Sequence, residues 1–183
     1  MCGGGMRVIT GSARGRKLLT LPGDDVRPTT DKVKESVFNI IQFAVPACSF
    51  LDLFAGSGQI GIEALSRGAA KATFVDSSKS SIEVVRKNLS STGFENESSV
   101  FQLDSIAFLA RCGEKFDLAF LDPPYGSGLL QAALRKIGPL MNENGIVVCE
   151  NPVDEELDDS FENLEKEKEY RYGKLKLTKY IVP

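Results

Sequence analysis

The pattern of hydrophobic and polar positions changes near residue 50, where short apolar runs begin to alternate with amphipathic stretches. Strands are predicted at residues 49–54, 71–75, 99–103, 116–121 and 145–150. Helices are predicted near residues 58–67, 80–91, 105–111 and 128–137, the second with a capping box of Ser80 and Glu83. Nearly continuous apolar strands that alternate with helices are typical of a parallel sheet covered on both faces.

The two ends of the chain follow different patterns. Residues 164–173 and 174–182 alternate polar and apolar positions around Gly173, which predicts an antiparallel hairpin at the sheet edge. Two short strands are predicted at 6–11 and 16–21 around the turn from Gly11 to Gly15. A helix ended by Pro46 follows, with one apolar face formed by Val33, Val37, Ile40, Ile41 and Ala44.

These patterns predict one doubly wound α/β fold with a seven-stranded, mostly parallel, Rossmann-like sheet. The C-terminal hairpin is its antiparallel part. Residues 6–46 are expected to form a small hairpin-plus-helix appendage, and residues 47–183 the main domain.

Composition narrows the chemistry. The 183 residues include no histidine, which excludes histidine-based triads and the usual zinc enzymes. Four cysteines lack any short paired spacing, so neither a metal site nor a disulfide framework is expected, and a reducing cytoplasm is the expected location. No apolar run approaches the roughly 18 residues that a membrane span needs.

Charge is unevenly distributed around a net value of −3. That sign argues against a general nucleic-acid coat, but basic residues near both ends leave room for a local phosphate-binding face. RNA phosphates are the predicted partners of Arg14, Arg16, Lys17 and Arg27. The alternative is that these four side chains are ordinary solvated surface.

The segment "LDLFAGSGQIG" at 51–61 carries Gly56, Gly58 and Gly61 between a predicted strand and helix. This G-x-G-x-x-G spacing points first to a dinucleotide. Asp52 argues against a dinucleotide, because its carboxylate would repel a pyrophosphate. The carboxylate suits a cationic ligand without phosphate, such as S-adenosylmethionine (SAM).

Further acids follow the next strands. Asp76 suits a ribose diol, and Asp104 could accept from an adenine amine, with the Ser105 N–H nearby. Each acid alone could equally be a helix N-cap or a turn residue. Together with Asp52, Asp122 and the glycine loop they favour a ligand site at the carboxyl ends of the strands.

The segment "FLDPPYGSG" at 120–128 places a carboxylate and an aromatic ring around two prolines. Asp122 and the Pro123 carbonyl could accept both protons of an exocyclic amine, while the rings of Pro123 and Pro124 fix the backbone. Tyr125 offers a flat face for an extruded base. The simpler alternative is a strand terminator with an incidental aromatic residue.

The motifs "LDLFAGSGQIGIEALSRGA" and "LDPPYGSG" resemble those of class I SAM-dependent methyltransferases that modify exocyclic amines. With "RVITGSARGRKLLTL" and "RPTTDKVKESVFNII", the pattern resembles the bacterial 16S ribosomal RNA guanine-N2 methyltransferase family over most of residues 7 to 182. The segment "VDSS" at 75–78 departs from relatives that often carry further charge there.

The resemblance implies a monomeric enzyme that methylates a specific guanine in small-subunit rRNA. It implies catalytic roles for Asp122, Pro123, Pro124 and Tyr125. It implies SAM contacts at Asp52, Phe54, Ala55, Gly56, Ser57, Gly58, Asp76, Ser77, Asp104, Ser105 and Asp122.

Three alternatives remain at this point. A DNA adenine or cytosine amino-methyltransferase shares the chemistry, but the residues before position 47 leave little room for an element that reads the major groove. A NAD-dependent oxidoreductase fits the glycine spacing but not Asp52 or the D-P-P-Y segment. A non-catalytic nucleic-acid-binding module would be expected to be strongly basic.

Overall fold

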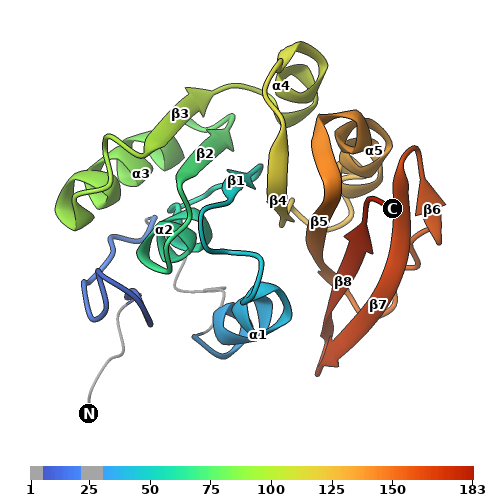
Figure 1. The fold of residues 1–183 in the computed structure, drawn as a ribbon, viewed down its shortest axis with the longest axis horizontal. Coiled ribbons are helices and arrows are strands. Elements are labelled where there is room, and N and C mark those ends of the chain that lie inside the picture. The colour runs from blue at the N-terminus through green and yellow to red at the C-terminus, as the bar shows by residue number, and fades with distance from the viewer. Residues whose placement is uncertain (1–5, 22–30) are drawn as a thin grey trace.

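A computed structural model describes residues 6–21 and 31–183, and its centre is one eight-stranded sheet (Figure 1). The strand order is β3-β2-β1-β4-β5-β8-β7-β6. The strands are β1 (Ser49–Asp52), β2 (Lys71–Asp76), β3 (Ser98–Gln102), β4 (Phe116–Leu121), β5 (Met141–Pro152), β6 (Ser160–Phe161), β7 (Leu164–Tyr172) and β8 (Leu175–Ile181).

The first five strands are parallel and the last three are antiparallel. β1 pairs with β2 and β4, β2 with β3, and β4 with β5, all in parallel. β8 returns antiparallel along β5, and β7 pairs with β8 as the outer arm of a hairpin. The mostly parallel sheet and the C-terminal hairpin at Gly173 are therefore confirmed. The sheet has eight strands rather than seven, because the two residues of β6 pair with β7.

Helices cover both faces of the sheet, as the doubly wound prediction requires. They are α1 (Asp31–Ile41), α2 (Gln59–Ser66), α3 (Lys79–Thr92), α4 (Ser105–Arg111) and α5 (Leu129–Ile137), followed by the short 3₁₀ helix η2 (Gly138–Leu140). None of the helices within residues 6–21 and 31–183 combines the length and the apolar character that crossing a membrane needs.

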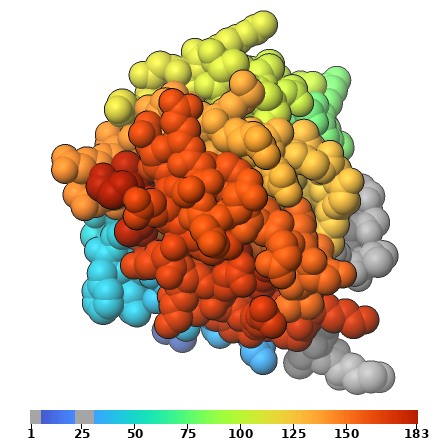
Figure 2. Space-filling model, turned by 90° about the vertical axis from the view of Figure 1, so that its right-hand side faces the viewer, coloured from blue at the N-terminus to red at the C-terminus, as the bar shows by residue number. Residues whose placement is uncertain are grey.

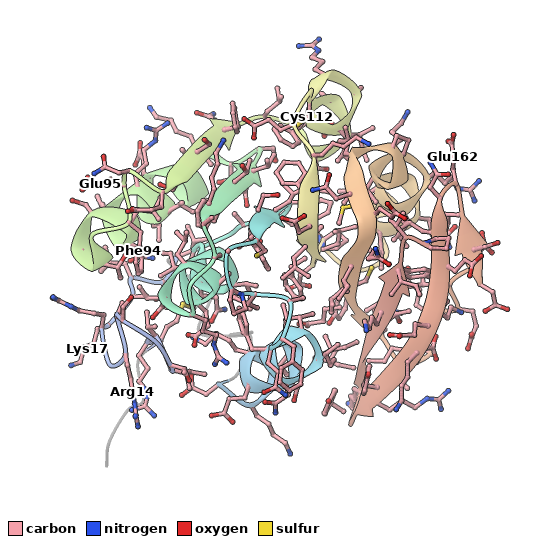
Figure 3. All side chains as sticks on the ribbon, viewed as in Figure 1. Arg14, Lys17, Phe94, Glu95, Cys112 and Glu162 are labelled. Atoms are coloured by element: carbon pink, nitrogen blue, oxygen red, sulfur yellow. The ribbon has the colours of Figure 1, made fainter. Side chains whose placement is uncertain are left out.

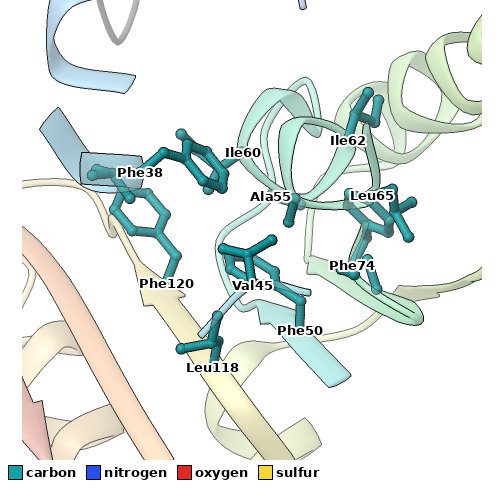
Figure 4. Close-up of a cluster of buried hydrophobic side chains, with 14 of the residues drawn as sticks. Phe38, Val45, Phe50, Ala55, Ile60, Ile62, Leu65, Phe74, Leu118 and Phe120 are labelled. Atoms are coloured by element: carbon teal, nitrogen blue, oxygen red, sulfur yellow. The ribbon is translucent and has the colours of Figure 1, made fainter. Parts of the chain in front are cut away.

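Two separate hydrophobic clusters fill the space between helices and sheet. On one face, α1, α2 and α3 pack against the sheet, and Phe38, Ile60 and Phe74 are buried there (Figure 4). On the other face, α4 and α5 contribute Phe108 and Leu134 to the second cluster. Apolar residues on both sides of the same strands explain why those strands read as continuous apolar runs.

Some local predictions were wrong. Helix α3 begins at Lys79, and its N-cap is Ser78, whose Oγ accepts from the Ser81 N–H. The capping box of Ser80 and Glu83 is therefore not formed. The segments 6–11 and 16–21 are joined only by a single antiparallel bridge between Arg7 and Lys17, so they are not strands.

The N-terminal loop, residues 6–21, is held by side chains of α2 rather than by strand pairing. Glu63 Oε2 and Oε1 accept from the N–H groups of Ile9 and Thr10 at 2.8 and 2.9 Å. The same carboxylate lies 3.8 Å from Lys34 Nζ and 2.9 Å from Arg67 Nε, and the Glu63 and Lys34 side chains are fully buried. A buried ionic cluster therefore joins the loop, α1 and α2.

Asn88 of α3 makes a second connection to this loop. Its Oδ1 accepts from Leu19 N–H, and its Nδ2 donates to the carbonyls of Leu19 and Ser57. Because Ser57 belongs to the glycine loop, one buried side chain links the N-terminal loop to the site described next.

Candidate cofactor and base-binding site

A cavity of about 830 Å³ opens at the carboxyl ends of β1, β2 and β4. This position, beside the point where the strand order reverses, is where open α/β sheets bind ligands. The cavity lining includes Asp52, Phe54, Ala55, Gly56, Ser57, Asp76, Ser77, Asp104, Ser105, Asp122, Pro123 and Pro124. The structure thus brings together nearly all of the residues that the sequence assigned to cofactor and catalysis.

Each of the three loop glycines meets a different constraint. Gly56 has a φ of +54°, and a Cβ atom there would meet no atom within 4 Å, so the backbone borders open space. A Cβ on Gly58 would lie 3.2 Å from Val85, and one on Gly61 would lie 2.3 Å from the Phe74 ring. Gly58 does not line the cavity. Only Gly56 therefore offers close backbone approach to a ligand, while Gly58 and Gly61 let α2 pack closely.

Asp52 lies at the end of β1 and is 2% exposed. Its Oδ2 accepts from the Gly61 N–H at 3.0 Å, which ties the strand to the first turn of α2. Burial raises the pKa of Asp52 to about 7, the Gly61 hydrogen bond opposes this shift, and the charge of Asp76 adds to it. A cation bound in the cavity would favour the ionised carboxylate.

Asp76 and Asp104 both have structural partners in addition to any ligand. Asp76 Oδ2 accepts from the Gly56 N–H at 2.9 Å and its Oδ1 from the Ser78 N–H at 2.8 Å. Asp104 is the N-cap of α4, where its Oδ1 accepts from the Ala107 N–H at 2.9 Å. The structural alternative considered for single acids therefore applies to both residues, although both also border the cavity.

The D-P-P-Y segment lies directly after β4. Asp122, Pro123 and Pro124 border the cavity, whereas Tyr125 does not. The Tyr125 hydroxyl donates to Glu150 Oε1 at 3.0 Å, across from the end of β4 to β5. Tyr125 borders a second, more open hollow of about 590 Å³. The aromatic ring is therefore fixed beside the cavity rather than inside it.

Sequence reasoning missed several residues of this site. Glu150 borders the cavity and is 3% exposed. Lys32 of α1 and the β7–β8 turn with Lys174 also border the cavity. Glu150 could have been found, because it is an acid at the end of the apolar run 145–150, much as Asp76, Asp104 and Asp122 stand at the ends of theirs. The two lysines come from opposite ends of the chain, and no local pattern places them together.

The predicted RNA contacts lie on the N-terminal loop. Arg14, Arg16 and Lys17 are exposed, and Figure 3 shows Arg14 and Lys17 extending away from the body of the protein. Arg27 lies outside the described residues. Across the part of the chain that the structure describes, no cluster of three or more cysteine or acidic side chains is arranged to hold a metal ion.

Comparison with known proteins gives consistent matches over most of the chain. A family model described as "Conserved hypothetical protein 95" matches residues 6–181. A candidate rRNA methyltransferase, YlbH of Bacillus subtilis, is 40% identical over 173 residues, covering 92% of this chain and 94% of its own. "Ribosomal RNA small subunit methyltransferase D" of Escherichia coli is 38% identical over 142 residues, covering 78% and 69%.

The fold comparison agrees. The structure of a candidate methyltransferase, yhhF of Escherichia coli, superimposes with a TM-score of 0.85 at 32% identity and covers 98% of both chains. The eight-stranded sheet with its antiparallel C-terminal strands is thus a class I methyltransferase fold.

Proposed function

This chain belongs to the family described as Conserved hypothetical protein 95, and we propose that it methylates the exocyclic N2 amine of a guanine in small-subunit rRNA. The names of its relatives support SAM-dependent methylation of ribosomal RNA as its activity. The choice of guanine N2 rests on the sequence resemblance to the 16S rRNA guanine-N2 methyltransferases, whereas the chemistry of the site supports methylation of an exocyclic amine. The observation that carries it is the placement of Asp122 and Pro123 in one cavity with Asp52, Asp76 and Asp104.

The cavity residues fit SAM, which supplies an electrophilic methyl group when it is bound. Gly56 leaves open space above the backbone for the amino acid part of the cofactor. The buried Asp52 favours a cationic neighbour, because a positive charge nearby offsets the free energy that burial adds to ionising the carboxyl. We assign the ribose hydroxyls to Asp76 and the adenine amine to Asp104 Oδ2, since Oδ1 caps α4.

Asp122 and Pro123 then act on the acceptor base. The Asp122 carboxylate and the Pro123 carbonyl each accept a hydrogen bond from one N–H of the guanine amine, which favours a more tetrahedral nitrogen with an available lone pair. Asp122 can also take the proton that the amine loses on methylation. Pro123 and Pro124 hold the carbonyl in a fixed direction, so little reorganisation is needed during the reaction.

Tyr125 supports base capture from the second hollow. Its ring can stack on an extruded base, which is worth about 1–3 kcal/mol. The hydrogen bond to Glu150 restricts the ring to one orientation. We infer that residues 6–46 form the RNA-contacting appendage, with Arg14, Arg16 and Lys17 on phosphates, and residues 47–183 the methyltransferase domain.

The test is single-turnover methylation of small-subunit particles from cells that lack this enzyme, followed by mass spectrometry of digested rRNA. Asp122→Ala should lower the rate constant by on the order of 10²–10³, the usual effect of deleting one preorganised partner. Glu95→Ala, which removes an exposed carboxylate far from the cavity, is the matched control and should not change the rate.

Two results would contradict the proposal. A methylated nucleoside other than N2-methylguanosine would exclude the assigned acceptor atom. A folded Asp122→Ala protein that binds SAM and methylates at the wild-type rate would show that D-P-P-Y only ends a strand.

A further inference from the structure

The lining of the main cavity is strongly biased in charge. Its acidic residues are Asp52, Asp76, Asp104, Asp122 and Glu150. Lys32 and Lys174 are the only basic residues that border it in the described part of the chain. A neutral base can enter such a cavity, but an RNA phosphate is repelled by the carboxylates and attracted only near the two lysines.

The two lysines come from different parts of the fold. Lys32 lies in the first turn of α1, and Lys174 lies in the turn between β7 and β8. Figure 1 shows α1 and this turn at the same end of the molecule. Both side chains are exposed, and neither forms an ion pair with another residue of 6–21 or 31–183.

The position of Lys174 is fixed by the backbone around it. Gly173 takes a left-handed φ of +62°, which reverses the chain between the strands. The Lys174 carbonyl accepts from the Val153 N–H at 3.0 Å, which ties the turn to the residue after β5. Lys174 and Leu175 also border the hollow that contains Tyr125. Lys174 therefore stands between the main cavity and the proposed stacking ring.

We propose that Lys32 and Lys174 form a phosphate clamp, which holds the backbone phosphates on either side of the extruded target guanosine. An extruded base enters the pocket while its sugar–phosphate backbone stays at the mouth. A lysine ammonium on a flexible stem suits contact with a phosphate there. The clamp rests on the proposed function and adds the nucleotide-backbone site to it.

The clamp differs in location from the N-terminal arginines. Arg14 and Arg16 lie on the exposed loop and do not border the cavity. We therefore expect them to contribute to RNA affinity at any point along the strand. Lys32 and Lys174 should instead act only on the linkages next to the target guanosine.

The experiment uses an rRNA fragment that carries the guanosine methylated by the wild-type enzyme. A second version has uncharged methylphosphonate linkages on both sides of that guanosine. The proteins are wild type, Lys32→Gln, Lys174→Gln and the double variant. Lys87→Gln, on the exposed face of α3, is the matched control. Affinity is measured as a function of salt concentration, and SAM affinity is measured in parallel.

With the natural fragment, the slope of log affinity against log salt should fall by about 0.7 for each lysine removed. The methylphosphonates should weaken binding to the wild type and to Lys87→Gln. They should have almost no further effect on the double variant. SAM affinity should stay at the wild-type value in every protein, since Lys32 and Lys174 are assigned to RNA.

The clamp is overturned if the methylphosphonates weaken the double variant as much as the wild type. It is also overturned if Lys87→Gln lowers the salt slope as much as either clamp variant. Failure of the proposed function would look different: the wild-type enzyme would methylate an atom other than guanine N2, whatever the binding data show.

Discussion

Replacing Glu63 with Gln tests how the N-terminal loop is attached to the methyltransferase domain. The Glu63 carboxylate accepts from Ile9 and Thr10 and is the ionic partner of Lys34 and Arg67. Burial lowers the pKa of Lys34, and the charge of Glu63 acts against this shift. Removing one partner of a buried pair costs about 3–5 kcal/mol, because the remaining charge is left without compensation.

Gln has nearly the same shape as Glu, so the substitution removes charge without leaving a large cavity. We expect the free energy of unfolding to fall by about 3–5 kcal/mol, measured by urea denaturation with circular dichroism. Glu83→Gln in the exposed pair with Lys79, whose side chains are 57% and 79% exposed, should cost less than about 1 kcal/mol. A Glu63→Gln protein within 1 kcal/mol of the wild type would refute the claim that this cluster holds the loop.

Three further outcomes follow from the site. Because the pKa of Asp52 is raised to about 7, its carboxyl is largely protonated below that pH, so binding a cationic cofactor should release a proton. SAM affinity should therefore rise with pH up to about 7, and calorimetry in buffers of different ionisation enthalpy should detect the released proton; pH-independent affinity would contradict this. Tyr125→Phe keeps the ring but removes the hydrogen bond to Glu150, so unfolding free energy should fall by about 1–3 kcal/mol while RNA affinity stays near the wild type. Asp76→Ala leaves the N–H groups of Gly56 and Ser78 without their acceptor, so SAM affinity by calorimetry should fall at least about tenfold. An unchanged affinity would exclude both the contact of Asp76 with the ribose and its role in positioning the glycine loop.

The sequence predicted the repeating part of the fold closely, because there each strand or helix is encoded locally. Helix α4 begins and ends at the predicted residues, and strand β4 does as well. Strand β1 ends two residues earlier than predicted, because the chain turns after Asp52 into the glycine loop. The apolar pattern continues through Leu53, which is buried as loop rather than as strand.

The N-terminal segment was predicted less well for a physical reason. Its alternating residues suggested two strands, but its backbone forms a single bridge, and other backbone groups bond to side chains of α2 and α3. Partners of this kind are more than 50 positions away in sequence, as between Ile9 and Glu63. The same limit applies to Lys32 and Lys174, which meet at one cavity only after the sheet is assembled.

The position of β8 between β5 and β7 also determines when the sheet can be completed during synthesis. β5 pairs with β8, although β7 precedes β8 along the chain, so one edge of β5 has no neighbour until the last strand is made. That edge includes Val147 and Val148, and an unpaired apolar edge favours association with other chains. Figure 2 shows the C-terminal residues, in orange to red, over the centre of this face of the molecule. The same hairpin supplies the turn with Lys174, so the mouth of the cavity takes shape only after both β7 and β8 have been made.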